Sequence, residues 1–152
     1  MTLENLLPLI MRWIHILTAI VAVGGSFFLR VVLMPAASAV LSREEHNKLR
    51  PVLLRRWQKV VHVCIALFLL SGLYNYLAVT RHLHEGQPLY HALFGVKFLL
   101  ALGIFTLAVL LTSLKPYTER LRTNSRFWLS LLLTLAFLVV LISGYMKQIP
   151  PI

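Results

Sequence analysis

The chain has 152 residues, of which 59% are hydrophobic and only 13% are charged, against about 25% charged residues in ordinary soluble domains. This composition excludes a disordered tail and argues against a soluble globular domain. The 15 Lys and Arg residues outnumber 5 Asp and Glu, giving a net charge of +10. A positive charge of this size can indicate a nucleic-acid-binding protein, but the long uncharged stretches of the chain argue against that class. The single cysteine, Cys64, excludes an intrachain disulfide.

Four apolar stretches follow one another along the chain, and each is long enough for the roughly 20 residues that cross a bilayer. None of them contains Asp or Glu. Because a backbone in lipid must satisfy its own hydrogen bonds, we expect each stretch to be helical. The sequence therefore predicts an all-α polytopic membrane protein, a single domain built as a four-helix up-down bundle. Its helices are expected over about residues 6–34, 52–80, 88–115 and 125–147.

Local signals mark the helix ends and one bend. Pro88 suits the first turn of the third helix, where the missing N–H costs nothing. Asn124 and Ser125 can cap the fourth helix. Gly24 and Gly25 indicate a close approach of another helix, or a bend, in the first.

The segment between the first two spans carries its own pattern. Ser42 and Glu45 have capping-box spacing, which indicates a short interfacial helix. Pro51 is expected to end that helix or to start the next one. The first span is expected to remain in the protein rather than to be cleaved as a signal peptide, because no basic region precedes its apolar core.

The distribution of basic residues indicates how the chain is oriented in the membrane. They gather in the first loop (Arg43, Lys48, Arg50, Arg55 and Arg56) and in the third (Lys115, Arg120, Arg122 and Arg126). The second loop has only Arg81, beside Glu85. The positive-inside rule places the first and third loops in the cytoplasm and both termini outside, which is an N-out/C-out topology. The expected location is a bacterial inner membrane. We expect these loops to contact anionic lipid rather than nucleic acid.

Titratable side chains inside an apolar zone are costly, and by default they are functional candidates. The rise of a helix places His15 about 9 Å, and Lys97 about 7–8 Å, to the outer side of the midplane. His62 falls about 10–12 Å to the inner side, near Arg30. His91 is expected close to the outer surface. Arg30 lies near the end of a span, where its side chain can reach the interface.

Helical phase groups some of these residues. At 3.6 residues per turn, His15 shares a stripe with small residues, which leaves room for close packing or for a flat ligand. The expected outer cavity contains His15, Lys97, Tyr76 and Tyr145. The loop residues His46, His82 and His84 are expected to be solvated.

Histidine inside a helical bundle suits haem iron or another transition metal. His15, His62 and His91 are the candidate metal ligands. Ligation of one haem by both His15 and His62 conflicts with their different depths, whereas His15 and His91 match better. Alternatively, a single axial histidine would work with Lys97 or Arg30 pairing a propionate.

Copper is the main rival cofactor, because Cu(I) accepts Cys, Met and His ligands. Cys64 follows His62 by two residues, so the two side chains point apart on a helix. The methionines form no close cluster. A copper site would have to draw on His15, His62 and Met146.

Three stretches resemble a known superfamily. They are residues 15–30 (HILTAIVAVGGSFFLR), residues 55–57 (RRW) leading to 71–74 (SGLY), and residues 94–100 (FGVKFLL). They are similar to the copper-resistance protein D-like membrane domain and to its relative, the HemJ-type protoporphyrinogen oxidase. Residues 65–67 read Ile-Ala-Leu, where the HemJ-type proteins usually carry Pro-Ala-Met.

The resemblance implies a four-helix membrane bundle, haem b and the oxidation of protoporphyrinogen. It matches His15 to a functional histidine, Arg30 to an arginine at the far end of the same helix, and Lys97 to a lysine of the third helix. The leading expectation is a haem b-binding membrane redox protein, with His15, His62, His91, Lys97, Arg30 and Tyr76 as candidate cofactor-binding residues.

The alternatives are a copper-handling membrane protein and a helper subunit of a membrane complex. Oxidoreductase activity is open, since no nucleophile–base pair or acidic catalytic group is visible. The expected partners are the lipid bilayer, haem or another anionic porphyrin, a quinone or redox partner, and a second copy of the chain, with no nucleic acid.

Overall fold

The computed structural model describes residues 3–151, without the side chains of residues 3–5 and Arg122. Within these residues the chain forms helices joined by turns, and no strand. The α-helices are α1 (Leu3–Ala19), α2 (Gly25–Phe28), α3 (Met34–Val40), α4 (Arg43–Tyr74), α5 (Arg81–Leu83), α6 (Pro88–Thr112), α7 (Glu119–Thr123) and α8 (Ser125–Met146). Wider π-helical turns, η1 (Ile20–Gly24), η2 (Leu29–Leu33) and η3 (Asn75–Thr80), join several of them, and a 3₁₀ turn, η4 (Pro116–Thr118), precedes α7.

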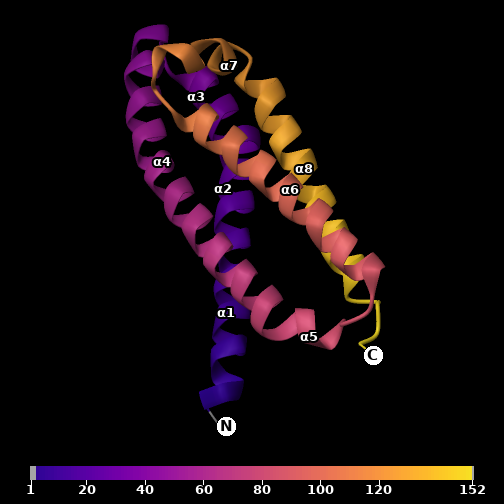
Figure 1. The fold of residues 1–152 in the computed structure, drawn as a ribbon. Helices are drawn as coiled ribbons and strands as arrows, with labels where there is room; N and C mark the ends of the chain where they lie inside the picture. Colours follow the sequence, from indigo (N-terminus) through magenta and orange to yellow (C-terminus); the bar gives the residue numbers. More distant parts are fainter. Residues whose placement is uncertain (1–2, 152) are drawn as a thin grey trace.

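These elements combine into four rods that are long and apolar enough to cross a membrane. They cover Leu6–Val40, Arg43–Leu83, Pro88–Thr112 and Ser125–Met146. The predicted all-helical architecture with four membrane-length helices is therefore confirmed. The rods alternate in direction, so the N-terminus, α5 and the C-terminus lie at one end while α3 and α7 lie at the other (Figure 1).

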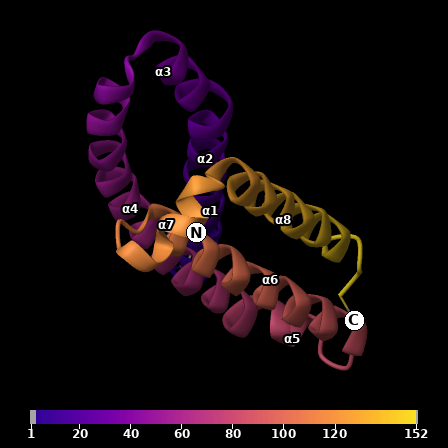
Figure 2. The ribbon, with the colours of Figure 1, turned by 90° about the horizontal axis from the view of Figure 1, so that it is seen from above.

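The rods pack as two pairs. α1 packs on α4 and α6 on α8, while contacts between α4 and α6 and between α2 and α8 join the pairs. Seen from above, α6 and α8 extend to one side of the loop formed by α1–α4 (Figure 2). A small core between α6 and α8 contains Leu107, Leu111 and Leu132.

Most apolar side chains face outward. Leu70 is 67% exposed and Leu99 is 69% exposed, although both lie in the middle of apolar helices. The total accessible surface is 10284 Å², whereas a compact soluble monomer of this mass would expose about 7,800 Å². A large apolar surface of this kind suits a protein whose solvent is lipid.

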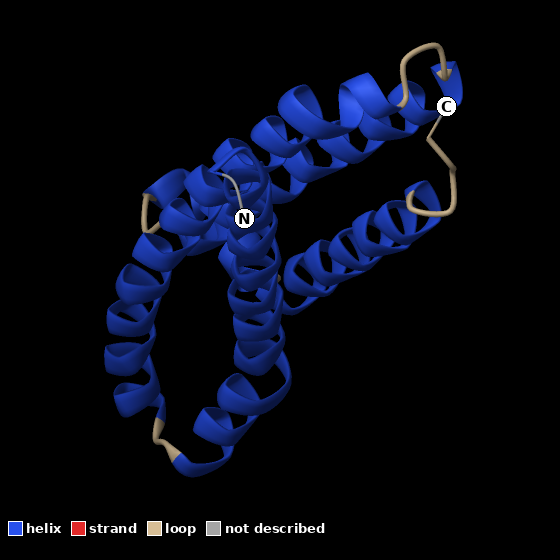
Figure 3. Ribbon diagram, turned by 90° about the horizontal axis from the view of Figure 1, so that it is seen from below, coloured by secondary structure: helices blue, strands red, loops and turns tan. Residues whose placement is uncertain are grey.

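Short connections join the rods at their ends (Figure 3). The turn before α6 contains Gly86, whose φ of 82° lies in the left-handed region that glycine adopts without strain. Pro88 occupies the first turn of α6, as predicted. Asn124 precedes α8, but its side chain makes no capping hydrogen bond, so the expected cap is wrong. The Asn124 carbonyl instead accepts from the N–H groups of Phe127 and Trp128.

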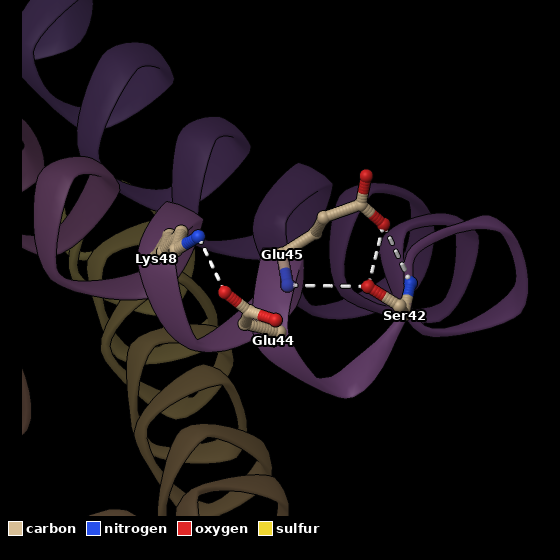
Figure 4. Close-up of polar contacts among 4 residues, drawn as sticks. All are labelled: Ser42, Glu44, Glu45 and Lys48. Atoms are coloured by element: carbon tan, nitrogen blue, oxygen red, sulfur yellow. Dashed lines mark hydrogen bonds and ion pairs between the residues drawn. The ribbon is translucent and has the colours of Figure 1, made fainter.

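The capping box at the start of α4 is confirmed (Figure 4). The Glu45 carboxylate accepts hydrogen bonds from the Ser42 backbone N–H (2.9 Å) and hydroxyl (2.7 Å), and the Ser42 Oγ lies 3.3 Å from the Glu45 N. The separate interfacial helix is wrong, because α4 runs through Pro51 without a break. The loss at a proline is one backbone hydrogen bond, and the other turns of this long helix remain intact.

The first turns of α4 extend beyond the apolar stretch of the same rod. α4 begins at Arg43, and the apolar residues begin at about residue 60, so about 25 Å of helix separates them at 1.5 Å per residue. This extension carries exposed polar side chains, including the ion pair between Lys48 and Glu44 at 2.6 Å. Ser42 and Glu45 therefore lie outside the apolar part of this rod.

Candidate functional site

His15 on α1 is tied to α4 by a hydrogen bond to a buried serine. Its Nδ1 lies 2.9 Å from the Oγ of Ser71, a residue with no exposed surface. The Ser71 hydroxyl donates its proton to the carbonyl of Leu67 at 2.6 Å. A carbonyl can only accept, and a hydroxyl has one proton, so Ser71 must accept from His15. His15 is then the tautomer protonated at Nδ1, and the lone pair of its Nε2 is free.

Neighbouring residues fix the plane of the His15 ring. Gly72 lies so close that a Cβ at that position would be 3.3 Å from the His15 Cε1. Phe68 meets the imidazole edge-on, with centroids 5.1 Å apart. Phe68 in turn stacks on Phe105 of α6 at 5.7 Å. Side chains of α4 and α6 thus hold a half-buried imidazole in one orientation.

Lys97 of α6 brings a positive charge to the same level of the bundle. A charge on Lys97 acts on the His15 imidazole through space, without a direct hydrogen bond between the two side chains. Lys97 is half-buried and forms no hydrogen bond or ion pair with any residue the structure describes. The apolar stretches contain no Asp or Glu. An anion that pairs with Lys97 at this depth must therefore come from outside the chain.

Tyr76 and His91 form a second, separate pair. The Tyr76 hydroxyl lies 2.9 Å from the His91 Nδ1, and the phenol ring stacks on Phe94 at 3.5 Å with an interplanar angle of 5°. Tyr76 follows Ser71 by five residues, about 7–8 Å along the helix. The structure thus joins Tyr76 to His91 rather than to His15. Tyr145, the fourth residue of the expected cavity, is 57% exposed.

The turn beside this pair holds another histidine. His84 is only 7% exposed, stacks on Tyr90 at 3.7 Å and has its Nδ1 2.7 Å from the Gln87 Oε1. The expectation that His84 is solvated is therefore wrong. The Gln87 amide also donates to the carbonyl of Pro150 at 2.9 Å, which ties the turn to the C-terminal segment.

His62 and Arg30 lie away from His15. His62 is exposed and donates from Nδ1 to the Gln58 carbonyl at 2.7 Å. It precedes Ser71 by nine residues on α4, about 13–14 Å of rise, so the structure does not bring it to His15. Arg30 follows His15 by 15 residues, about 22 Å along its own rod. The Arg30 Nε is buried without a hydrogen-bond partner among the described residues.

The protein side chains alone make no metal cage in the described part of the chain. No three His, Cys, Asp or Glu residues gather there in a group that could hold a metal ion. Cys64 is buried and free.

Ser71 and Gly72 belong to the SGLY stretch of the sequence analysis, but sequence reasoning did not place either of them at the His15 site. The sequence offers one weak signal for them, a small polar residue beside a glycine within an apolar stretch, and that pattern equally suits plain helix packing. The partner of His15 became visible only with the relative position of α1 and α4.

No protein-family model, curated protein or solved structure matches the chain. The functional interpretation therefore rests on the geometry of His15, Ser71 and Lys97.

Proposed function

We propose that the protein is a haem b-binding membrane redox protein, with His15 as an axial ligand of the iron. The observation that carries the proposal is the hydrogen bond from the His15 Nδ1 to Ser71. Histidines that ligate metals usually donate their other ring N–H to a neighbouring acceptor, which fixes the tautomer and the orientation of the ring. His15 has this arrangement, because its Nδ1–H donates to Ser71 and its Nε2 stays free to bind a metal.

The ligand inventory favours haem over a copper ion. Haem brings four nitrogen donors of its own, so the protein needs to supply only one or two axial ligands. A copper site built from His15, His62 and Met146 would require residues that lie at different levels of the bundle. Haem is therefore the cofactor that asks for the fewest ligands from this chain.

Lys97 supplies the charge that an anionic cofactor needs. Haem has two propionate groups, and a half-buried ammonium with no partner in the described chain is suited to pair with one of them. Arg30 lies too far along the rod to serve the same group, so we assign this role to Lys97 alone. The bound haem would supply one-electron chemistry, while the chain supplies binding, orientation and electrostatics.

We also propose that the two connections at the α3 and α7 end face the cytoplasm of a bacterium and that both termini face outward. The basic residues of the sequence gather at this end, and the alternation of the rods puts both termini at the other (Figure 1). Reporter fusions test the topology. A phosphatase fused after residue 152 should be active, because the enzyme is active only outside the cytoplasm. An inactive phosphatase, together with a fluorescent signal from green fluorescent protein fused at the same position, would contradict the proposed topology.

A spectrum of the purified full chain tests the cofactor. We expect a Soret band that shifts on reduction, and we expect His15→Ala to lose it while His82→Ala, an exposed histidine elsewhere, keeps it. A wild-type preparation that stays colourless after haem supplementation would contradict the proposal. Stoichiometric copper without haem in a metal analysis would favour a copper-handling protein instead.

A further inference from the structure

A basic cleft on α4 lies on the face opposite the packed side of the helix. It is shallow and open to the surroundings, because all its lining residues belong to α4: Arg55, Arg56, Gln58, Lys59, His62 and Val63. We call this feature the α4 cleft. It belongs to the α3 and α7 end of the molecule, away from His15.

The opposite side of α4 packs against α2 through Trp57. The Trp57 ring lies against Gly25 of α2, so closely that a Cβ on this glycine would overlap it. At 100° per residue, Arg55, Lys59 and His62 lie about 140–200° around the helix from Trp57. The α4 cleft therefore faces away from α2, toward the surroundings of the protein.

The positive charge of the cleft is not neutralised by the chain. Arg55, Arg56 and Lys59 are exposed and make no hydrogen bond or ion pair with any described residue. The nearest preceding carboxylates are engaged elsewhere, Glu44 with Lys48 and Glu45 with Ser42. The sequence has no further Asp or Glu until Glu85. Glu119 of α7 also lies at this end, where it lines a neighbouring pocket with Arg50 and Leu54 of α4, but it forms no ion pair with the cations of the cleft. These cations are therefore available to an external anion.

The position of the cleft along the rod points to the phosphate of a lipid. The apolar part of the second rod begins at about residue 60, so Arg55 and Arg56 lie at the polar side of this boundary and Val63 at the apolar side. His62 donates from Nδ1 to the Gln58 carbonyl, which fixes its ring beside Lys59. A phospholipid has the matching order of groups, an anionic phosphate above and acyl chains below.

We propose that the α4 cleft binds the phosphate headgroup of an anionic phospholipid from the surrounding bilayer. The cations hold the phosphate and Val63 contacts the start of an acyl chain. The inference does not depend on haem, because His15 and Lys97 take no part in it. Its test and the test of the cofactor can therefore fail independently.

The experiment uses the full chain reconstituted in phosphatidylcholine vesicles that contain a small share of spin-labelled phosphatidylglycerol or spin-labelled phosphatidylcholine. The motionally restricted fraction of each probe gives the relative association of the two lipids. We expect wild type to prefer phosphatidylglycerol. Arg55→Gln with Lys59→Gln should reduce that preference, by about fivefold for each lost charge if each contributes as a cation near a membrane surface usually does.

The matched control is Lys115→Gln with Arg120→Gln, which removes the same charge from exposed residues at the same end of the molecule. It should keep the preference. An equal loss in this control would show diffuse attraction by the whole basic end and overturn the site. Equal association of both lipids with wild type would also overturn it. Displacement of the labelled phosphatidylglycerol by millimolar inorganic phosphate would overturn the lipid assignment in favour of a free-phosphate site. Unchanged helicity by circular dichroism checks that both variants fold.

Discussion

The Nδ1 of His15 and the Oγ of Ser71 lie 2.9 Å apart, although 56 positions separate the two residues in the chain. Because Ser71 donates its own proton to Leu67, this contact sets the tautomer of His15 and leaves Nε2 as the free nitrogen. It also joins α1 to α4 at the level of Lys97. One buried hydroxyl thus links the packing of the bundle to the chemistry of its candidate site.

Ser71→Ala tests this link. The alanine keeps the helix and nearly the same volume but removes the acceptor for the His15 Nδ1 proton. We expect the affinity for haem to fall by about 10–100-fold, the usual effect of losing the hydrogen-bond partner of a metal-ligating histidine. Haem titration followed at the Soret band measures the change.

Ser26→Ala is the matched control for Ser71→Ala. Ser26 is also a buried serine, 7% exposed, on a rod that packs against α4. No hydrogen bond of the structure joins Ser26 to His15, so we expect Ser26→Ala to leave the affinity for haem unchanged. Equal affinity of Ser71→Ala and wild type would remove the support for His15 as an oriented ligand.

Two adjacent glycines give opposite predictions. A Cβ on Gly25 would lie 2.9 Å from the Trp57 Cζ3 and closer still to Cη2, whereas a Cβ on Gly24 would meet nothing within 4 Å. Gly25→Ala should therefore destabilise the bundle by about 1–3 kcal/mol through overpacking. Gly24→Ala should be neutral or stabilising by up to about 1 kcal/mol, because alanine favours helix. Unfolding in increasing sodium dodecyl sulfate, followed by circular dichroism, measures both. A similar stability of the two variants would mean that Trp57 does not pack on Gly25.

Tyr76→Phe tests the pair between Tyr76 and His91. Phenylalanine keeps the stack on Phe94 but removes the hydroxyl that lies 2.9 Å from the His91 Nδ1. We expect a loss of about 0.5–1.5 kcal/mol in unfolding free energy, the usual value of one hydrogen bond. The Soret band should not change, because Tyr76 lies outside the His15 site.

Tyr117→Phe is the control for Tyr76→Phe, because Tyr117 is 68% exposed and its ring contact with Lys115 does not need the hydroxyl. It should unfold as wild type does. A Soret shift in Tyr76→Phe would mean instead that Tyr76 and His91 belong to the cofactor site.

The sequence alone was enough to predict the four membrane-length helices, because lipid leaves a backbone few other solutions and the apolar stretches are long. It was also enough for the capping box of Ser42 and Glu45, which is a local pattern. The passage of α4 through Pro51 was not predicted. A proline signals the loss of one hydrogen bond, but whether a helix continues depends on the turns on both sides of it.

The candidate site was predictable in part. Helix rise placed His15 and Lys97 at a similar level, and in the structure a charge on Lys97 acts on His15 through space. The partner of each histidine was not predictable, because it depends on how two helices rotate against each other. Helical phase alone suggested Tyr76 for the cavity of His15, while the structure pairs Tyr76 of η3 with His91 of α6. His84 was misplaced for a different reason, because its burial comes from Gln87 and Tyr90, which follow it in the same turn and in the first turn of α6.

The last prediction concerns pH and the start of α4. Hydrogen bonds from Ser42 hold the pKa of Glu45 below its ordinary value of 4.5. A carboxylate whose pKa is lowered by folding stabilises the folded form above its ordinary pKa, and the contribution is lost as the pH falls through the lowered value. The first turn of α4 should therefore loosen only in acid. Amide hydrogen exchange of residues 43–47 measures this, and Glu45→Gln should exchange faster than wild type at neutral pH. Glu44→Gln is the matched control, because it also removes one carboxylate of the first turn, with its exposed ion pair to Lys48, but leaves the hydrogen bonds between Ser42 and Glu45 in place. It should exchange more slowly than Glu45→Gln; equally fast exchange in both variants would show that the capping box does not hold this helix end.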